Sequence, residues 1–295
     1  MTSTPAIDVH DLNVRYGDFH AVKNLTFQVE RGELYALLGT NGAGKTSTLE
    51  VMEGHRTASS GTITVLGENP GDRHALRPRT GIMLQESGFA PDLTVTETVA
   101  LLGRLSGRED RVERVLEVVD LRHKASTRVS QLSGGEKRRL DFATALYGSP
   151  ELIFLDEPTT GLDIASRDAL WSVVDDLRRT GSTVILTTHY LEEAQQRADR
   201  IGLMHQGTFR HEGTVAELTR SLPAVIAFSL PTEAPSPPAQ AARIGEASFQ
   251  IESHELQRDL TALMDWARTH DVALEGLSAA PTRLDDVFRA IEPTA

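Results

Sequence analysis

Apolar and polar positions follow two kinds of pattern up to about Arg220. Alternation predicts two half-buried strands near the start of the chain, at 7–14 and 22–29. Continuous apolar runs of strand length follow at 33–38, 81–84, 151–156 and 182–188. Between 92 and 147 the apolar spacing changes to three and four, as at Val112, Val115, Leu116 and Val119, which is typical of helices. This order predicts an α/β domain with a largely parallel sheet and an inserted helical subdomain at about 88–147.

The pattern changes again after Leu222. The stretch PTEAPSPPAQAA at 231–242 is rich in Pro and Ala and almost uncharged, which predicts a long loop or linker. Beyond it we expect a strand, a helix, a second strand and a short last helix, at 248–252, 254–268, 271–277 and 284–291. From Ser221 onward there are 11 acidic and 5 basic residues, so this small α/β module is not expected to bind an anionic partner. The sequence therefore predicts a main domain over 1–220 and an accessory domain over 221–295.

Composition excludes several classes of protein. The net charge of -12 and the dispersed basic residues, only four of them Lys, argue against a general nucleic-acid binder. With no Cys, the chain has no disulfide and no thiolate site. Its longest apolar runs are strand-sized, and the start MTSTPAIDVHDL lacks the basic and apolar regions of a secretory signal. We therefore expect no membrane-spanning segment and a cytoplasmic location.

A glycine-rich loop is the first candidate for chemistry. GTNGAGKT at 39–46 fills all four fixed positions of G-x-x-x-x-G-K-[ST] and follows a predicted strand. Its glycines allow backbone N–H groups to face inward, and the next helix adds its positive end. Lys45 can then reach the outer phosphates, and Thr46 can offer a hydroxyl to Mg²⁺. A turn whose glycines serve only packing is the alternative, which the complete motif disfavours.

The strand at 152–156 ends in two consecutive acids, in LIFLDEPTTGLD. Asp156 can approach a metal held through Thr46, and Glu157 is placed to polarise an attacking water. A single acid after a strand is often only a solvated turn. Two acids followed by Pro158 favour a chemical role.

LSGGE at 132–136 supplies a second helix N-terminus suited to an anion. Ser133 can cap the helix that begins near Gly135, while Gly134 and Gly135 leave backbone N–H groups uncovered. An isolated SGG is more often a well-capped helix. Its position ahead of Asp156 in the same chain favours the anion-binding interpretation.

Together, in this order, the motifs resemble an ATP-binding cassette ATPase, the nucleotide-binding component of an ABC transporter, over residues 6 to about 220. The resemblance implies a P-loop NTPase core of α/β class, with an N-terminal antiparallel β subdomain, the inserted helical subdomain and a small C-terminal α/β module. GTNGAGKT resembles the Walker A loop, LSGGE the family signature and LIFLDE the Walker B strand. Thr40 stands where the family usually has Pro, and Glu136 where it often has Gln, but neither change removes a ligand.

The resemblance also assigns residues outside the three motifs. It implies that Tyr16 stacks on adenine, Gln85 contacts Mg²⁺ and links the site to the helical subdomain, Asp163 communicates between sites, and His189 holds the γ-phosphate. Taken alone, Tyr16 could be a core or surface aromatic, Gln85 a polar strand end and His189 a structural histidine. The implied ATP-binding set is Tyr16, Gly39, Thr40, Asn41, Gly42, Ala43, Gly44, Lys45, Thr46, Ser47, Gln85, Ser133, Gly134, Gly135 and Asp163. The implied Mg²⁺ ligands are Thr46, Gln85 and Asp156, and the implied catalytic residues are Lys45, Glu157 and His189.

In this family two cassettes pair head to tail. The resemblance therefore implies that Ser133 and Gly135 of one copy close over ATP held by Lys45 of a second copy or of a homologous cassette. If the pair is homomeric, both composite sites are expected to hydrolyse ATP.

A lone cassette without membrane spans implies a separate permease and a location on the inner face of the cell membrane. TTGLD and the ending PTRLDDVFRAIE resemble daunorubicin-resistance-type ATPases, which work with ABC-2-type permeases as exporters; the ending can also serve by packing Leu284, Val287 and Phe288. Two alternatives remain. One is a soluble ABC ATPase acting on nucleic acid or the ribosome, although such proteins usually carry two cassettes or a long coiled-coil insertion. The other is a binding module with an inactive ATPase. The residues do not distinguish among drug, lipid, polysaccharide and peptide as cargo.

Overall fold

The computed structural model describes residues 4–85, 88–220, 222–231 and 234–291. The chain divides into two compact units, Met1–Glu212 and Gly213–Ala295. This division precedes the boundary expected after 220, because helix α8 (Val215–Arg220) packs against the last helix, α10 (Leu284–Ile291).

The first unit begins with a three-stranded antiparallel sheet in the order β2-β1-β4. Strands β1 (Ile7–Tyr16) and β2 (Phe19–Val29) bury alternate side chains, as their pattern predicts. Strand β4 (Ser60–Val65) was not anticipated, because its apolar positions are only two, Ile63 and Val65, and most of its other side chains are exposed. The antiparallel N-terminal subdomain is thus confirmed.

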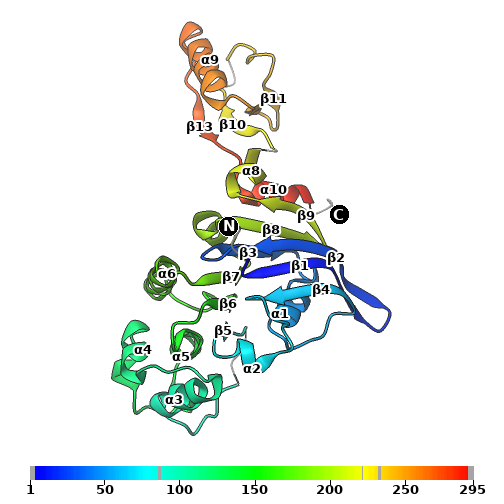
Figure 1. The fold of residues 1–295 in the computed structure, drawn as a ribbon. Helices are drawn as coiled ribbons and strands as arrows, with labels where there is room; N and C mark the ends of the chain where they lie inside the picture. Colours follow the sequence, from blue (N-terminus) through cyan, green and yellow to red (C-terminus); the bar gives the residue numbers. More distant parts are fainter. Residues whose placement is uncertain (1–3, 86–87, 221, 232–233, 292–295) are drawn as a thin grey trace. The chain divides into compact units, whose positions relative to one another are not determined.

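A six-stranded sheet in the order β5-β6-β7-β3-β8-β9 forms the centre of this unit (Figure 1). Its strands are β3 (Leu34–Gly39), β5 (Thr80–Met83), β6 (Leu152–Asp156), β7 (Thr183–Thr187), β8 (Arg200–His205) and β9 (Thr208–Gly213). Strand β3 pairs in parallel with β7 and β8, and β6 pairs in parallel with β5 and β7. The predicted parallel sheet is confirmed, and the carboxyl ends of these strands share one edge, where α/β sheets bind ligands.

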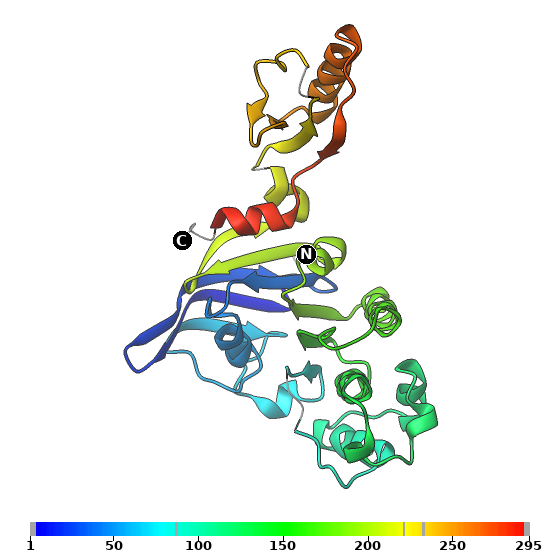
Figure 2. The same cartoon turned by 180° about the vertical axis from the view of Figure 1, so that it is seen from behind.

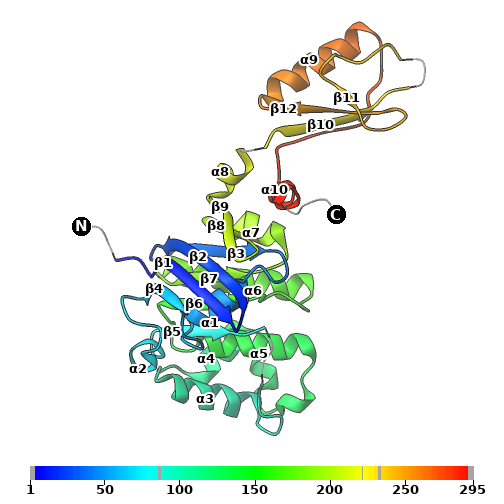
Figure 3. The ribbon, with the colours of Figure 1, turned by 90° about the vertical axis from the view of Figure 1, so that its right-hand side faces the viewer.

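Helix α1 (Lys45–Met52) packs between the two sheets. Its residues Leu49, Val51 and Met52 belong to the same buried cluster as Val9 of β1 and Phe154 of β6, and Figure 2 shows the helix from behind. Helices α6 (Ile164–Arg179) and α7 (Leu191–Arg197) lie on the opposite side of the larger sheet from β1 and β4 (Figure 3). The helix that follows the glycine loop is therefore fixed by apolar contacts on both sides.

The inserted segment is helical, as its spacing predicts. It contains α3 (Val95–Ser106), α4 (Val112–Val118), two short 3₁₀ turns and α5 (Gly134–Leu146). Helices α3 and α4 both pack against α5, and α5 packs against β5. Through α5, the helical segment contacts the edge of the central sheet. The short helix α2 (Arg73–Leu76) lies outside this segment, before β5.

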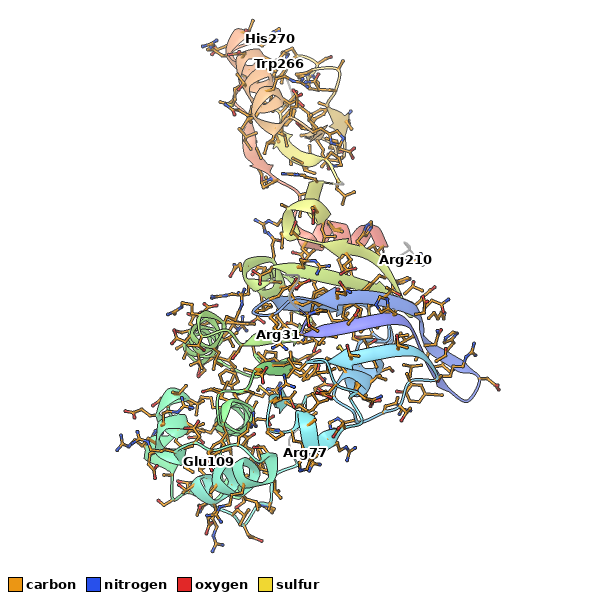
Figure 4. The ribbon with its side chains drawn as sticks, viewed as in Figure 1. Arg31, Arg77, Glu109, Arg210, Trp266 and His270 are labelled. Carbon is orange, nitrogen blue, oxygen red and sulfur yellow. The ribbon has the colours of Figure 1, made fainter. Side chains whose placement is uncertain are left out.

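The second unit contains a four-stranded antiparallel sheet in the order β11-β12-β10-β13. The strands are β10 (Ala224–Ser229), β11 (Ala242–Arg243), β12 (Ser248–Ser253) and β13 (Glu275–Ala280). Helix α9 (Leu256–Thr269) packs on β10 and β13 through Leu263, and its Trp266 ring lies 5.3 Å from that of His270 (Figure 4). In α10, Leu284 and Val287 are buried, so the terminal LDDVF segment does have the packing role.

One strand was predicted to begin several residues before its observed start. The expected strand at 271–277 starts at Glu275 instead, because the chain is still leaving α9 at 270–272. Val272 N–H bonds to Ala267 O, and Asp271 adopts a left-handed conformation with φ 55. Strand β10 was missed within the apolar stretch that follows Leu222.

Candidate nucleotide site

The glycine loop begins directly at the end of β3. A Cβ at Gly39 would lie 2.4 Å from Met204 O, and one at Gly44, which has φ 104, would lie 2.6 Å from Ala21 O. Both positions exclude larger side chains because neighbouring backbone passes so close. The turn before α1 is thus shaped by contacts with two other strands, β2 and β8.

Lys45 is the first residue of α1 and bends back over the loop. Its Nζ donates to Gly39 O at 2.8 Å and to Thr40 O at 3.1 Å. Burial lowers the pKa of Lys45, and the carboxylates of Glu157 and Asp156 oppose that shift. The ammonium group is thus bound to the loop and interacts electrostatically with Asp156 at the end of β6 and with Glu157 after it.

Asp156 is the last residue of β6 and is paired in register with Thr187 of β7. The Thr187 hydroxyl donates to the Asp156 carboxylate. Burial raises the pKa of Asp156, while the bond from Thr187 works in the opposite direction. Neutralisation by a cation would remove this desolvation penalty.

Glu157 and His189 meet across the ends of β6 and β7. His189 Nδ1 lies 3.0 Å from Glu157 Oε2, and the Thr160 hydroxyl donates to the same oxygen at 3.3 Å. Glu157 itself has a left-handed backbone, with φ 48, and its N–H bonds to Thr187 O at 3.0 Å. A non-glycine residue in this region is strained and is often found at functional sites.

His189 is supported from its other side. Its ring centroid lies 4.0 Å from that of Tyr190, and the Arg167 guanidinium lies 4.9 Å from the Tyr190 ring. The two rings are tilted by 40° to each other, so His189 contacts both the Tyr190 ring and the Glu157 carboxylate.

The donor set expected for Mg²⁺ consists of hard oxygen ligands. One Asp156 oxygen accepts from Thr187, which leaves the second available, and Thr46 is exposed at the start of α1. Gln85 follows β5 and is also exposed, with its main-chain carbonyl accepting from Arg138. No group of three or more His, Cys, Asp or Glu in the described ranges could hold a metal alone. The residues fit an ion that takes the rest of its ligands from phosphate and water.

Tyr16, at the end of β1, is tied to the helix that follows the glycine loop. Its hydroxyl donates to Glu50 Oε2 and contacts Ser47 Oγ, each at 3.1 Å. The Arg56 guanidinium lies 4.1 Å from the ring centroid and bonds Glu50 at 2.8 Å. Because the residue remains 40% exposed, ring surface is free to receive a base.

The signature segment forms the N-terminus of α5. Ser133 Oγ accepts from Glu136 N–H at 3.3 Å, and Ser133 N–H donates to Glu136 Oε2 at 2.8 Å, which together form a capping box. A Cβ at Gly134 would meet nothing within 4 Å, whereas Gly135 lies near Gly161 O. The helix end is thus open at Gly134, and the binding of an anion there stays a prediction.

Asp163 caps the next helix, α6. Its carboxylate accepts from Ser166 N–H at 2.7 Å, which holds its pKa below the usual value. This bond shows that Asp163 caps α6. Its role in communication between two sites stays a prediction.

Glu136 gives a pH-dependent test of the signature segment. The Ser133 N–H, and then Lys124 at 3.0 Å, lower its pKa from 4.5 to about 2. The charged carboxylate therefore stabilises the fold above pH 4.5, and this contribution declines as pH falls towards 2. Glu136→Gln keeps the oxygen that accepts from Ser133 but removes the charge facing Lys124. We expect a loss of about 0.5 kcal/mol in unfolding free energy at pH 7, measured by urea unfolding.

The difference in unfolding free energy between wild type and Glu136→Gln should become smaller as the pH is lowered from about 5 to 3. Glu113→Gln is the matched control, because Glu113 is exposed in the first turn of α4. A difference that stays constant over this pH range would contradict the assigned charge interaction.

Two residues that contact the site residues were not anticipated, and neither was a third, Glu193, which contacts neighbours of the site in the sequence. Thr187 binds both acids of β6, and Arg138 of α5 donates to main-chain carbonyls around them. Glu193 is buried and accepts from Thr159 at 2.8 Å and Thr188 at 3.4 Å. A buried polar residue at the end of a strand, as in STVILTT, was the available signal for Thr187.

Comparison with protein families gives two matches. Residues 22–160 match the family described as ABC transporter. Residues 224–282 match the family described as ABC transporter domain-containing protein-like, C-terminal domain. The two matched ranges lie in the first and the second compact unit.

Curated relatives are similar over most of the chain. A Nod factor export ATP-binding protein I of Ralstonia nicotianae is 39% identical over 222 residues, covering 73% of this chain and 69% of the relative. The protein of the same name from Bradyrhizobium diazoefficiens is 41% identical over 217 residues, covering 72% and 71%.

Solved structures agree on the fold. An ATP-binding subunit of an ABC transporter is 27% identical, with TM-score 0.70, and the match covers 74% of this chain and 93% of that one. A bacterial ABC transporter cassette solved as a dimer has 24% identity and TM-score 0.65, covering 70% and 98%. Among the described residues, no helix combines the length and apolar character needed to span a bilayer.

Proposed function

The chain belongs to the ATP-binding proteins of the ABC transporter family, and from this we propose that it drives export through a separate membrane permease. It is an ATPase with an α/β cassette fold. The observation that carries the ATPase part of the proposal is the Glu157–His189 pair, 3.0 Å apart, together with the half-buried Lys45, which interacts electrostatically with Glu157. These are the groups that phosphoryl transfer to water requires.

Each residue has a distinct part in the proposed hydrolysis. The loop N–H groups and Lys45 bind the phosphates, and His189 holds the γ-phosphate. Glu157 orients the attacking water and accepts its proton at the carboxylate. Mg²⁺, for which Thr46, Gln85 and Asp156 are the proposed ligands, would neutralise phosphate charge when bound. Catalysis is then mainly positioning and electrostatic stabilisation.

The open signature end supports a paired enzyme. Ser133 and Gly134 stand at an uncovered helix N-terminus, which can bind the phosphates of ATP held by a second cassette. Because one surface would meet a different surface of the other copy twice, the pair is twofold symmetric with two composite sites. The partner is a second copy of this chain or a homologous cassette.

The direction of transport is proposed from the relatives. Those described above are export ATP-binding proteins, and the ending PTRLDDVFRAIE resembles ATPases that work with ABC-2-type permeases. The protein would bind such a permease at the inner face of the cell membrane. The unit after Gly213 serves as an accessory or regulatory domain. No observation favours the alternative, a soluble ATPase acting on nucleic acid or ribosomes, and the net charge of -12 opposes it.

Affinity purification tests the transport function. We expect the tagged full chain, purified from detergent-solubilised membranes of its source, to bring down a protein with several membrane spans. An untagged preparation is the control. Consistent recovery of the chain alone would contradict the proposal, and ribosome binding that survives a salt wash would support the alternative.

A further inference from the structure

Arg138 of α5 has a buried guanidinium group surrounded by main-chain carbonyls. Only 9% of its side chain is exposed. One terminal nitrogen, Nη2, donates to Asp156 O at 2.5 Å and to Glu157 O at 2.6 Å, and Nε donates to Pro158 O at 3.3 Å. The turn that carries both site acids is therefore bound by a single side chain from the helical segment.

The second terminal nitrogen of Arg138 reaches the strand next to β6. Nη1 donates to Leu84 O at 2.6 Å and to Gln85 O at 3.1 Å, directly after β5. It also lies 3.4 Å from the carboxylate of Asp141, one turn along α5. The planar guanidinium offers five N–H donors in a fixed fork, which suits it to join two segments at once.

These bonds matter for Glu157 because its backbone is strained. A non-glycine residue with φ 48 persists only where its surroundings hold it in place. Its N–H is held by Thr187 O, and its carbonyl accepts from Arg138 at 2.6 Å and from Thr160 N–H at 3.2 Å. Without Arg138 the carbonyl keeps only the longer bond from Thr160, so the turn can relax and move the carboxylate away from His189.

Arg138 also lies close to the signature. The helix that carries it begins at Gly134, so Arg138 is little more than one turn from Ser133. A displacement of the α5 N-terminus is thus passed through a rigid helix to the carbonyls of Glu157 and Gln85. Since each of these bonds lies within the first compact unit, this connection needs no second domain.

We infer that Arg138 is a positioning residue for hydrolysis, which holds Glu157 in its reactive conformation and joins the signature helix to residues 84–85. The inference rests on the proposed ATPase mechanism, because it concerns the alignment of the group that orients water. The bonds of Arg138 go to main-chain carbonyls and to Asp141, and none goes to the glycine loop. Removal of Arg138 should therefore lower kcat more than it weakens ATP binding.

Arg138→Met, Arg138→Lys and the control Arg139→Met test this in the full chain. Arg139 is adjacent on α5 but pairs with Asp120 at 3.3 Å. We expect Arg138→Met to lower kcat on the order of 100-fold, since a displacement of about 1 Å can have that effect. The KM for ATP and the affinity for a fluorescent ATP analogue should stay within about threefold. Arg139→Met should keep kcat within about twofold of wild type.

Lysine offers three donors on one nitrogen and cannot span both segments. Arg138→Lys should therefore recover only part of the lost kcat, at unchanged ATP affinity. If Arg138→Met does not fold, as judged by its thermal unfolding, Arg138→Lys decides the matter: a reduced kcat at wild-type affinity supports the inference. A wild-type kcat in the folded Arg138→Met or, failing that, in Arg138→Lys would overturn it, as would a parallel loss of kcat and affinity.

Two prior measurements separate this inference from the proposed function. Wild type must hydrolyse ATP, and Lys45→Ala must abolish that activity. If wild type does not hydrolyse ATP, or if Lys45→Ala still does, the proposed ATPase mechanism itself is contradicted. Normal turnover in Arg138→Met contradicts only the role of Arg138.

Discussion

Glu157→Gln should bind ATP, fail to hydrolyse it and accumulate as an ATP-bound dimer. Glutamine has the shape of glutamate and can still accept from Thr160, but it cannot take a proton from water. Loss of a general base lowers turnover by a factor of about 100 to 10,000. Because hydrolysis would normally separate the two copies, the closed dimer should persist. Phosphate release measures turnover, and size-exclusion chromatography with ATP measures the dimer.

Glu192→Gln is the matched control for this variant. Glu192 lies in α7, only a few residues after His189, but it is exposed. Its replacement removes the same charge without changing the 3.0 Å contact between Glu157 and His189. Unchanged hydrolysis in Glu157→Gln would remove Glu157 from the role assigned to it.

The sequence was enough to predict that the motifs at strand ends lie close together, because the geometry of a parallel sheet requires it. GTNGAGKT and LIFLDE each follow a continuous apolar run, and the carboxyl ends of such strands meet at one sheet edge. The order of these motifs along the chain is therefore enough to place Lys45, Asp156 and Glu157 near one another. His189 follows a third strand of the same kind, and its bond to Glu157 agrees with that argument.

Contacts made through the backbone could not be predicted in this way. The carbonyls that Arg138 binds belong to residues as far apart as Leu84 and Pro158, and a carbonyl is the same in every residue type. The left-handed backbone of Glu157 could not be predicted from the sequence either, because glutamate has no preference for this conformation. Strand β4 was missed for a different reason, since its alternation consists of only two apolar residues, Ile63 and Val65.

Two inactive variants should regain activity when they are mixed. Lys45→Ala disables the phosphate loop, and Gly134→Glu places a negative charge at the signature. A Cβ at Gly134 would meet nothing within 4 Å in its own chain, so we expect the second variant to fold normally. In a head-to-tail pair of the two variants, one composite site carries both defects and the other carries neither. ATP hydrolysis by an equimolar mixture should therefore reach about a quarter of the wild-type rate, because random pairing makes half of the dimers mixed.

This recovery would not occur if each chain completed its own site, because every chain in the mixture then carries a defect. Gly134→Ala is the matched control, since it adds a side chain without adding charge, and it should retain most of the activity alone. Sites that work only in concert would also leave the mixture inactive, so a second measurement is needed. The chain has no Cys, so Thr40→Cys with Ser133→Cys in the Glu157→Gln background offers only two thiols per copy. ATP-dependent cross-linking of two chains would then support the composite site, whereas an inactive mixture without cross-linked dimer would exclude it.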